Sequence, residues 1–164
     1  GGRKQRRRQR LDQLAKVNQS LHTGGVARTD SLGVALGSTR EVLRPGSLAM
    51  GICDESSLTP QCEQHLAMLS RHCDLLLMPV SDPLDHALPA AGLLRFAQRG
   101  AQLELDTLDD GLRLAYRQQA EARVERWELM AHKLRVLLMP LSTQSEMIEQ
   151  LREYLSAQRG GSNP

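Results

Sequence analysis

Aromatic residues are scarce in this chain of 164 residues, which has one Phe, one Trp and two Tyr. A site that stacks bases or sugars on aromatic rings would have few residues to use. The hydrophobic fraction is nonetheless 40%, so a core can form from Leu, Val, Ala and Met. The length is that of one domain, since domains commonly contain about 100–200 residues.

Cysteines and long apolar runs are also few. Cys53, Cys62 and Cys73 are an odd number without a C-x-x-C pair, which favours reduced thiols, a cytoplasmic location and no structural zinc. No apolar run approaches the roughly 20 residues of a membrane-spanning helix, so we expect no membrane insertion in this segment. The chain begins with Gly1-Gly2 and no Met, which suggests a piece of a longer protein.

Positive charge is concentrated at the start of the chain. Residues 1–10 carry six Lys and Arg and no acidic residue, whereas the rest carries 15 basic and 19 acidic residues. Apolar residues spaced three and four apart predict a helix over 3–21. Clustered Arg can neutralise nucleic-acid phosphates, but the body is acidic and no aromatics are interleaved. We therefore expect Arg6, Arg7 and Arg10 to be solvated or to contact an acidic protein partner.

Apolar runs alternate with amphipathic segments along the rest of the chain. Parallel sheets covered by helices have this pattern. The predicted fold class is therefore α/β, a Rossmann-like, mostly parallel sheet with helices on both faces. Strands are expected at 47–53 and 74–80, both buried, and at 135–141, with a hairpin at 93–97 and 102–106 and a turn at 82–85. Helices are expected at about 30–44, 60–72, 110–133 and 144–157, the last with Met147, Ile148, Leu151 and Leu155 facing inward.

Polar residues follow the predicted strands, at the edge where open parallel sheets bind ligands. Asp54 is the best-placed carboxylate, and hard cations such as Mg²⁺ prefer oxygen ligands. An enzyme that hydrolyses a phosphate or similar group with a cation at Asp54 is one reading. The alternative is that Asp54 caps the following loop and helix. The sequence has no phosphate-binding G-x-x-x-x-G-K-[ST] loop and no G-x-S-x-G elbow.

Two segments resemble a known family. Residues 43–48 (LRPGSL), followed by an apolar strand that ends in Asp54, are similar to one motif of the domain of unknown function 58 family. Residues 81–89 (SDPLDHALP) resemble its D-P-L-E-x-x-L-P stretch. The order of the later elements agrees as well, and the resemblance spans about residues 1–157.

The resemblance implies a von Willebrand factor A-like domain. Residues 1–157 would be its C-terminal portion with an added β-hairpin, and 158–164 a disordered tail. Such domains carry a metal-ion-dependent adhesion site, and Thr29 and Asp54 are similar in position to its second and third elements. Its first element, D-x-S-x-S, does not occur here. We therefore expect no cofactor, or weak Mg²⁺ binding once the upstream half is supplied.

The resemblance also implies a bacterial, non-enzymatic adaptor. Members of the family are commonly encoded near MoxR-type AAA+ ATPases, so the expected function is protein maturation or assembly with such a partner. Asp82 and Pro83 are the candidate partner-binding loop, and a truncated sheet predicts a homo-oligomer. A metal-dependent hydrolase at Asp54 and a nucleic-acid binder using the Arg-rich helix remain the alternatives.

Overall fold

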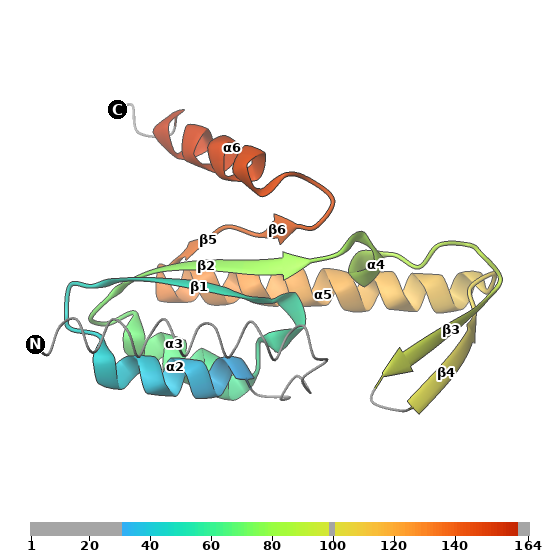
Figure 1. The fold of residues 1–164 in the computed structure, drawn as a ribbon, viewed down its shortest axis with the longest axis horizontal. Coiled ribbons are helices and arrows are strands. Elements are labelled where there is room, and N and C mark those ends of the chain that lie inside the picture. Colours follow the sequence, from blue (N-terminus) through green and yellow to red (C-terminus); the bar gives the residue numbers. More distant parts are fainter. Residues whose placement is uncertain (1–30, 99–100, 161–164) are drawn as a thin grey trace, which may run out of the picture.

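The computed structural model describes residues 31–98 and 101–160, which form a parallel sheet between helices and a separate hairpin (Figure 1). In chain order the elements are α2 (Ser31–Val42), β1 (Leu48–Asp54), the 3-10 helix η1 (Glu55–Ser57), α3 (Pro60–Leu69), β2 (Asp74–Ser81), α4 (Pro83–His86), β3 (Leu93–Gln98), β4 (Ala101–Asp106), α5 (Asp110–Leu134), β5 (Leu137–Leu138), β6 (Leu141–Ser142) and α6 (Met147–Gly160). The predicted fold class is confirmed.

The sheet is parallel, with β2 in the middle. β1 pairs with one side of β2, and β5 and β6 pair with the other. Met50 lies opposite Leu76 and Ile52 opposite Met78, so side chains of the same parity share a face. All strands end at the same edge, where the predicted polar residues follow them.

One face of the sheet is closely covered by α2, α3 and α5 (Figure 1). Thr59 starts α3 because its hydroxyl accepts from the Cys62 N–H, and Pro60 fits the first turn. Leu66 of α3 and Trp127 of α5 are 0% and 2% exposed. This face therefore holds the main core of the described chain.

Among the described elements, α6 alone covers the other face. Leu151 and Tyr154 of α6 pack against a small cluster of Met78, Met139 and Leu141. The Gln150 side chain accepts from the Ser142 N–H and donates to the Ser142 carbonyl, each at 2.8 Å. These bonds attach the start of α6 to β6.

Two burial predictions on this face are wrong. The run 47–53 was expected to be a buried strand, but Leu48, Met50 and Ile52 are 60%, 66% and 64% exposed. Apolar residues of α6 were also expected to face inward, yet Met147, Ile148 and Leu155 are all more than half exposed. The reason is common to both: β1 is an edge strand, and no described element lies over this part of the sheet.

The third predicted strand is interrupted. It was expected over 135–141, but Arg135 is the left-handed cap of α5, with φ 55°. Within this segment only the two short strands β5 and β6 pair with β2. Pro140 lies between them, and proline has no N–H to donate to a ladder. The helix predicted over 144–157 begins at Met147 and continues to Gly160.

The hairpin β3–β4 is confirmed, and it stands away from the sheet (Figure 1). Thr107 closes its base: the hydroxyl donates to the Gly92 carbonyl at 2.7 Å and accepts from the Ala91 N–H. Gly92 has φ +80°, a conformation that favours glycine. Thr107 is fully buried, so the hairpin is held at its base.

Candidate functional site

Asp54 ends β1 at the carboxyl edge of the sheet, and its side chain is already engaged locally. Oδ1 accepts from the Ser56 N–H at 2.7 Å and from the Ser56 hydroxyl at 2.5 Å. The Ser57 hydroxyl donates to the Asp54 carbonyl. The capping alternative is thus what the structure displays, although Asp54 remains exposed.

Glu55 directly follows Asp54 in the chain and is buried, with 8% exposure. Its Oε2 is 3.5 Å from His86 Nε2 and 3.9 Å from Arg123 Nε, and it has no hydrogen-bond partner among the described residues. Burial raises the pKa of the Glu55 carboxyl; His86 and Arg123 oppose that rise, and nearby carboxylates add to it. The carboxyl edge of the sheet thus holds two neighbouring carboxylates, an exposed one at Asp54 and a buried one at Glu55 with an oxygen that accepts no hydrogen bond from the described residues.

Side chains of α5 hydrogen-bond to the backbone of η1 and α4 at the carboxyl edge of the sheet. Trp127 Nε1 donates to the Glu55 carbonyl at 2.8 Å in a buried hydrogen bond. Arg123 Nη2 donates to the Asp85 carbonyl at 2.6 Å, and the Tyr116 hydroxyl donates to the Leu84 carbonyl at 2.9 Å. One face of α5 therefore positions both η1 and α4.

A polar cavity of about 320 Å³ results between these elements. Its lining combines three carboxylates with one guanidinium and two hydroxyls. The residues are Asp54, Glu55, Ser56, Asp85, Tyr116 and Arg123. Such a cavity can bind a polar or cationic group through hydrogen bonds.

A serine, a histidine and a carboxylate also meet here, but not as a catalytic triad. His86 Nε2 lies 2.9 Å from the Ser81 hydroxyl and 3.5 Å from Glu55 Oε2. A triad needs the histidine to contact the nucleophile with one ring nitrogen and the carboxylate with the other. Both contacts here use the same nitrogen, so the arrangement lacks the geometry of a triad.

The predicted loop at Asp82 and Pro83 is the start of the short helix α4 rather than a plain turn. Asp82 Oδ2 accepts from the Thr143 hydroxyl at 2.6 Å, and Oδ1 accepts from the Leu84 N–H. These two bonds lower the pKa of the exposed Asp82 carboxyl, in that order of importance. Its role in partner binding stays a prediction.

The described residues do not form a metal site by themselves. Within 31–98 and 101–160, no group of three or more His, Cys, Asp or Glu side chains is arranged to hold a metal ion. Asp54 and Ser56 alone would leave most of the six positions of Mg²⁺ to water. Thr29, the other predicted ligand, lies outside the described residues, as do Arg6, Arg7 and Arg10.

Sequence reasoning missed Glu55, His86 and Trp127 as parts of this edge. The spacing of Tyr116, Arg123 and Trp127, seven and then four residues, places them on one face of α5. That periodicity was the available signal, because polar and aromatic residues on one helix face indicate a buried contact with polar backbone.

None of the helices in the described part of the chain is both long and apolar enough to span a bilayer.

The fold and this edge define a parallel α/β domain whose polar residues gather at the carboxyl ends of the strands. A family model matches residues 4–126, and the chain belongs to that family, DUF58, described as a protein family of unknown function. The resemblance seen in residues 43–48 and 81–89 is thereby confirmed. Comparison with curated proteins and with solved structures gives no match.

Proposed function

We propose that this chain is a non-enzymatic protein-interaction module that works with a MoxR-type AAA+ ATPase in protein maturation or assembly. The observation that carries the proposal is the exposed stripe of β1, formed by Leu48, Met50, Ile52 and Asp54. All four side chains are exposed and alternate along an edge strand. Contiguous exposed apolar surface with a polar end is typical of interaction sites.

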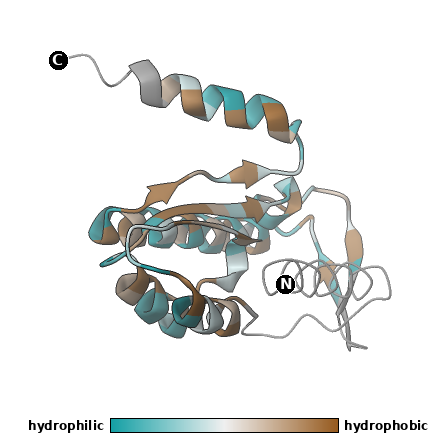
Figure 2. Ribbon diagram, turned by 60° about the vertical axis from the view of Figure 1, so that its left-hand side comes forward, coloured by the Kyte–Doolittle hydropathy of each residue, from teal (hydrophilic) through white to brown (hydrophobic). Residues whose placement is uncertain are grey.

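The stripe offers two modes of recognition at once. The outer edge of β1 is unpaired among the described residues, so its backbone groups can accept an additional strand. The apolar side chains lie on the α6 side of the sheet, where Figure 2 shows hydrophobic residues along the strands. A partner segment laid on β1 would bury these side chains and end beside Asp54.

The proposed relationship to von Willebrand factor A-like domains agrees with this surface. In that reading Asp54 is the third element of an adhesion site, and a bound cation would offer an open position to a partner carboxylate. The upstream half would supply the remaining ligands. Homo-oligomerisation through the same β1 edge is the competing use of the stripe.

Binding to a purified MoxR-type ATPase tests the proposal. Ile52→Glu places a charge in the middle of the stripe and should abolish co-elution in size-exclusion chromatography. Val34→Glu is the matched control, because Val34 is 56% exposed on α2, away from β1. Full binding by the Ile52→Glu protein, or equal loss in the control, would count against the stripe.

The metal part has its own test. Calorimetric titration with Mg²⁺ and Mn²⁺ should show binding only in a version extended upstream, and Asp54→Ala should remove it. Binding that survives Asp54→Ala would place the cation elsewhere.

No specific geometry favours the hydrolase alternative, and the nucleic-acid alternative depends on Arg residues outside the described ranges.

A further inference from the structure

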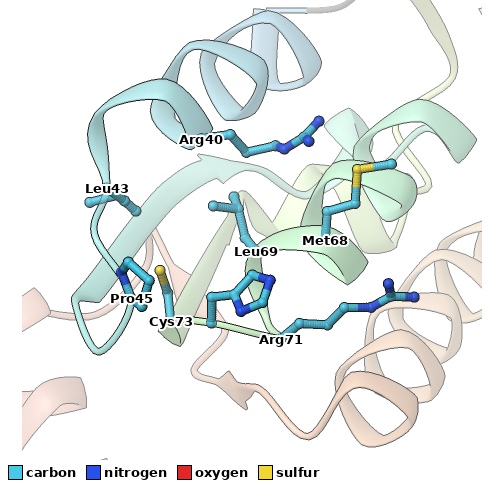
Figure 3. A pocket seen from close by; sticks show the side chains of 8 residues that line it. Arg40, Leu43, Pro45, Met68, Leu69, Arg71 and Cys73 are labelled. Carbon is cyan, nitrogen blue, oxygen red and sulfur yellow. The ribbon is translucent and has the colours of Figure 1, made fainter.

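A second cavity, of about 370 Å³, lies at the opposite edge of the sheet, near the starts of β1 and β2 (Figure 3). The end of α2 and the end of α3 form its walls. Its volume is in the range of small-molecule sites, which begin near about 300 Å³. It shares no lining residue with the cavity beside Asp54.

The walls of this cavity are basic. Arg40 comes from α2, and Arg71 and His72 follow the end of α3. In Figure 3 Arg40 and Arg71 extend along two sides of the pocket, with Met68 between them. None of the described residues that line the cavity carries a carboxylate.

Among the described residues Arg40 and Arg71 form no ion pair, and the same holds for Arg44, Arg117, Arg135 and Arg152. Within residues 31–98 and 101–160, no hydrogen bond or salt bridge is formed by the side chains of Arg40 and Arg71. Four arginines elsewhere in those ranges pair with carboxylates: Arg95, Arg113, Arg123 and Arg126. The guanidinium groups at the cavity are therefore available to an external anion.

Helix electrostatics account for only part of this arrangement. Arg40 lies in the last turn of α2, where a cation is favourable. Arg71 lies beyond the end of α3 at Leu69, on a different wall. The ends of α2 and α3 thus bring two unpaired cations to one cavity. A cation can stabilise a helix end without sharing a cavity with a second cation, so helix stability alone does not explain this arrangement.

The floor of the cavity is apolar. Leu69 and Cys73 are 5% and 9% exposed, and Leu43 and Pro45 complete the surface. The Cys73 thiol donates to the Arg44 carbonyl at 3.6 Å, so its polar hydrogen is directed away to the backbone. A ligand that consists only of a charged group would leave these apolar side chains exposed to solvent.

We propose that this cavity binds a small organic anion in which a carboxylate or phosphate is joined to a short aliphatic chain. The anion would accept hydrogen bonds from Arg40 and Arg71, whose planar guanidinium groups suit both carboxylate and phosphate. The aliphatic chain would cover Leu43, Leu69 and Met68. The cavity would therefore recognise a ligand that contacts the basic wall and the apolar floor at the same time.

Four simple probes separate charge from chain. Hexanoate and hexyl phosphate carry both features, inorganic phosphate lacks the chain, and hexylamine reverses the charge. Amide chemical-shift titration should show saturable shifts at Leu69 and Cys73 with the first two probes. We expect inorganic phosphate to bind at least about tenfold more weakly, and hexylamine not to shift these amides. Equal binding of hexylamine, or no saturable shift with either amphiphilic anion, would overturn the proposal.

Variants then test the residues. Arg40→Gln and Arg71→Gln should each weaken binding of hexyl phosphate by about tenfold. Arg44→Gln is the matched control, since Arg44 is an exposed neighbour that does not line the cavity, and its affinity should be unchanged. Met68→Glu should abolish binding by placing a negative charge in the site. Unchanged affinity in both Arg variants would contradict the assignment.

The source of the anion is distinguished by one more comparison. An amide-capped Leu-Glu-Leu peptide offers a carboxylate beside aliphatic side chains, as an acidic protein segment would. Tighter binding of this peptide than of hexyl phosphate would assign the site to such a segment. The reverse order would assign it to a free phosphate ester, and either result supports the shared chemistry.

Discussion

The two faces of the sheet differ in how completely they are covered. On the side of α2, α3 and α5, Cys62 and Leu66 are fully buried and Trp127 is 2% exposed. On the side of α6, Met50 and Ile52 are about two-thirds exposed although they are as apolar as the core residues. The same sheet thus has one face that stabilises the fold and another that is available for contact.

The strand β1 shows this division within seven residues. Ala49 and Cys53 pack against the main core, while Leu48, Met50 and Ile52 face the sparsely covered side. Successive side chains of a strand point to opposite faces, so one segment serves both purposes. Burial raises the pKa of the Cys53 thiol, which agrees with a structural rather than reactive residue.

The same substitution on the two faces should give the largest contrast. Leu66→Ala removes a fully buried side chain of α3 and should lower the free energy of unfolding by about 2–5 kcal/mol. Leu48→Ala removes a side chain that is 60% exposed and should change it by less than about 0.5 kcal/mol. Urea denaturation of both variants measures the difference. A comparable loss for Leu48→Ala would mean that this face is covered in solution.

Trp127→Phe tests how firmly the well-covered face supports the carboxyl edge. The change removes the Nε1–H that donates to the buried Glu55 carbonyl and should cost about 1–3 kcal/mol. Tyr116→Phe removes a hydroxyl whose bond to the Leu84 carbonyl is solvent-exposed, so it should cost less. Thermal or urea unfolding decides the order. A larger loss in Tyr116→Phe would show that α4, rather than η1, depends on α5.

The pH dependence of stability tests the burial of Glu55. Burial raises its pKa above the ordinary value of 4.5, so the folded chain favours the protonated carboxyl. That contribution is complete below the unfolded pKa and is lost as pH rises through the folded pKa. The stability of the native chain relative to Glu55→Gln should therefore fall as pH rises from 4.5, by at most about 1.4 kcal/mol for each pH unit of pKa displacement.

Urea denaturation of both proteins over this pH range provides the measurement. Asp82→Asn is a useful comparison because hydrogen bonds lower the pKa of Asp82, so its contribution has the opposite sign. It is lost as pH falls through the folded pKa, and is complete above the unfolded one. A constant difference between the native chain and Glu55→Gln would show that water reaches the Glu55 carboxyl.

The elements themselves were predictable because their signals are local. Thr59 and Pro60 start α3, Asp109 caps α5, and Gly46 permits the turn before β1 with φ +81°. The order of strands and helices then implied a parallel sheet. Asp54 was found at the carboxyl edge for the same reason, since it directly follows an apolar run.

Coverage of each face was not predictable in this way. An apolar run such as residues 47–53 has the same letters whether one face or both are buried, and only the position of β1 at the edge decides. The partners of Glu55 come from α4 and α5, at His86 and Arg123, which are 31 and 68 residues further on. Spacing within a single segment cannot report such long-range proximity.

The smallest expected effect concerns the ion pair between α3 and α5 on the well-covered side. Arg126 Nε and Nη2 both lie 2.7 Å from Glu63 Oε1, but the two side chains are 45% and 37% exposed. Solvent screens such pairs, so a double-mutant cycle with Arg126→Gln and Glu63→Gln should give a coupling of only about 0.2–1 kcal/mol, decreasing with salt. A larger, salt-insensitive coupling would show that charge, rather than the contacts of Leu66 and Trp127, holds α5 against α3. The covered face would then be held by charge, and apolar burial would no longer explain how it differs from the exposed apolar residues of β1.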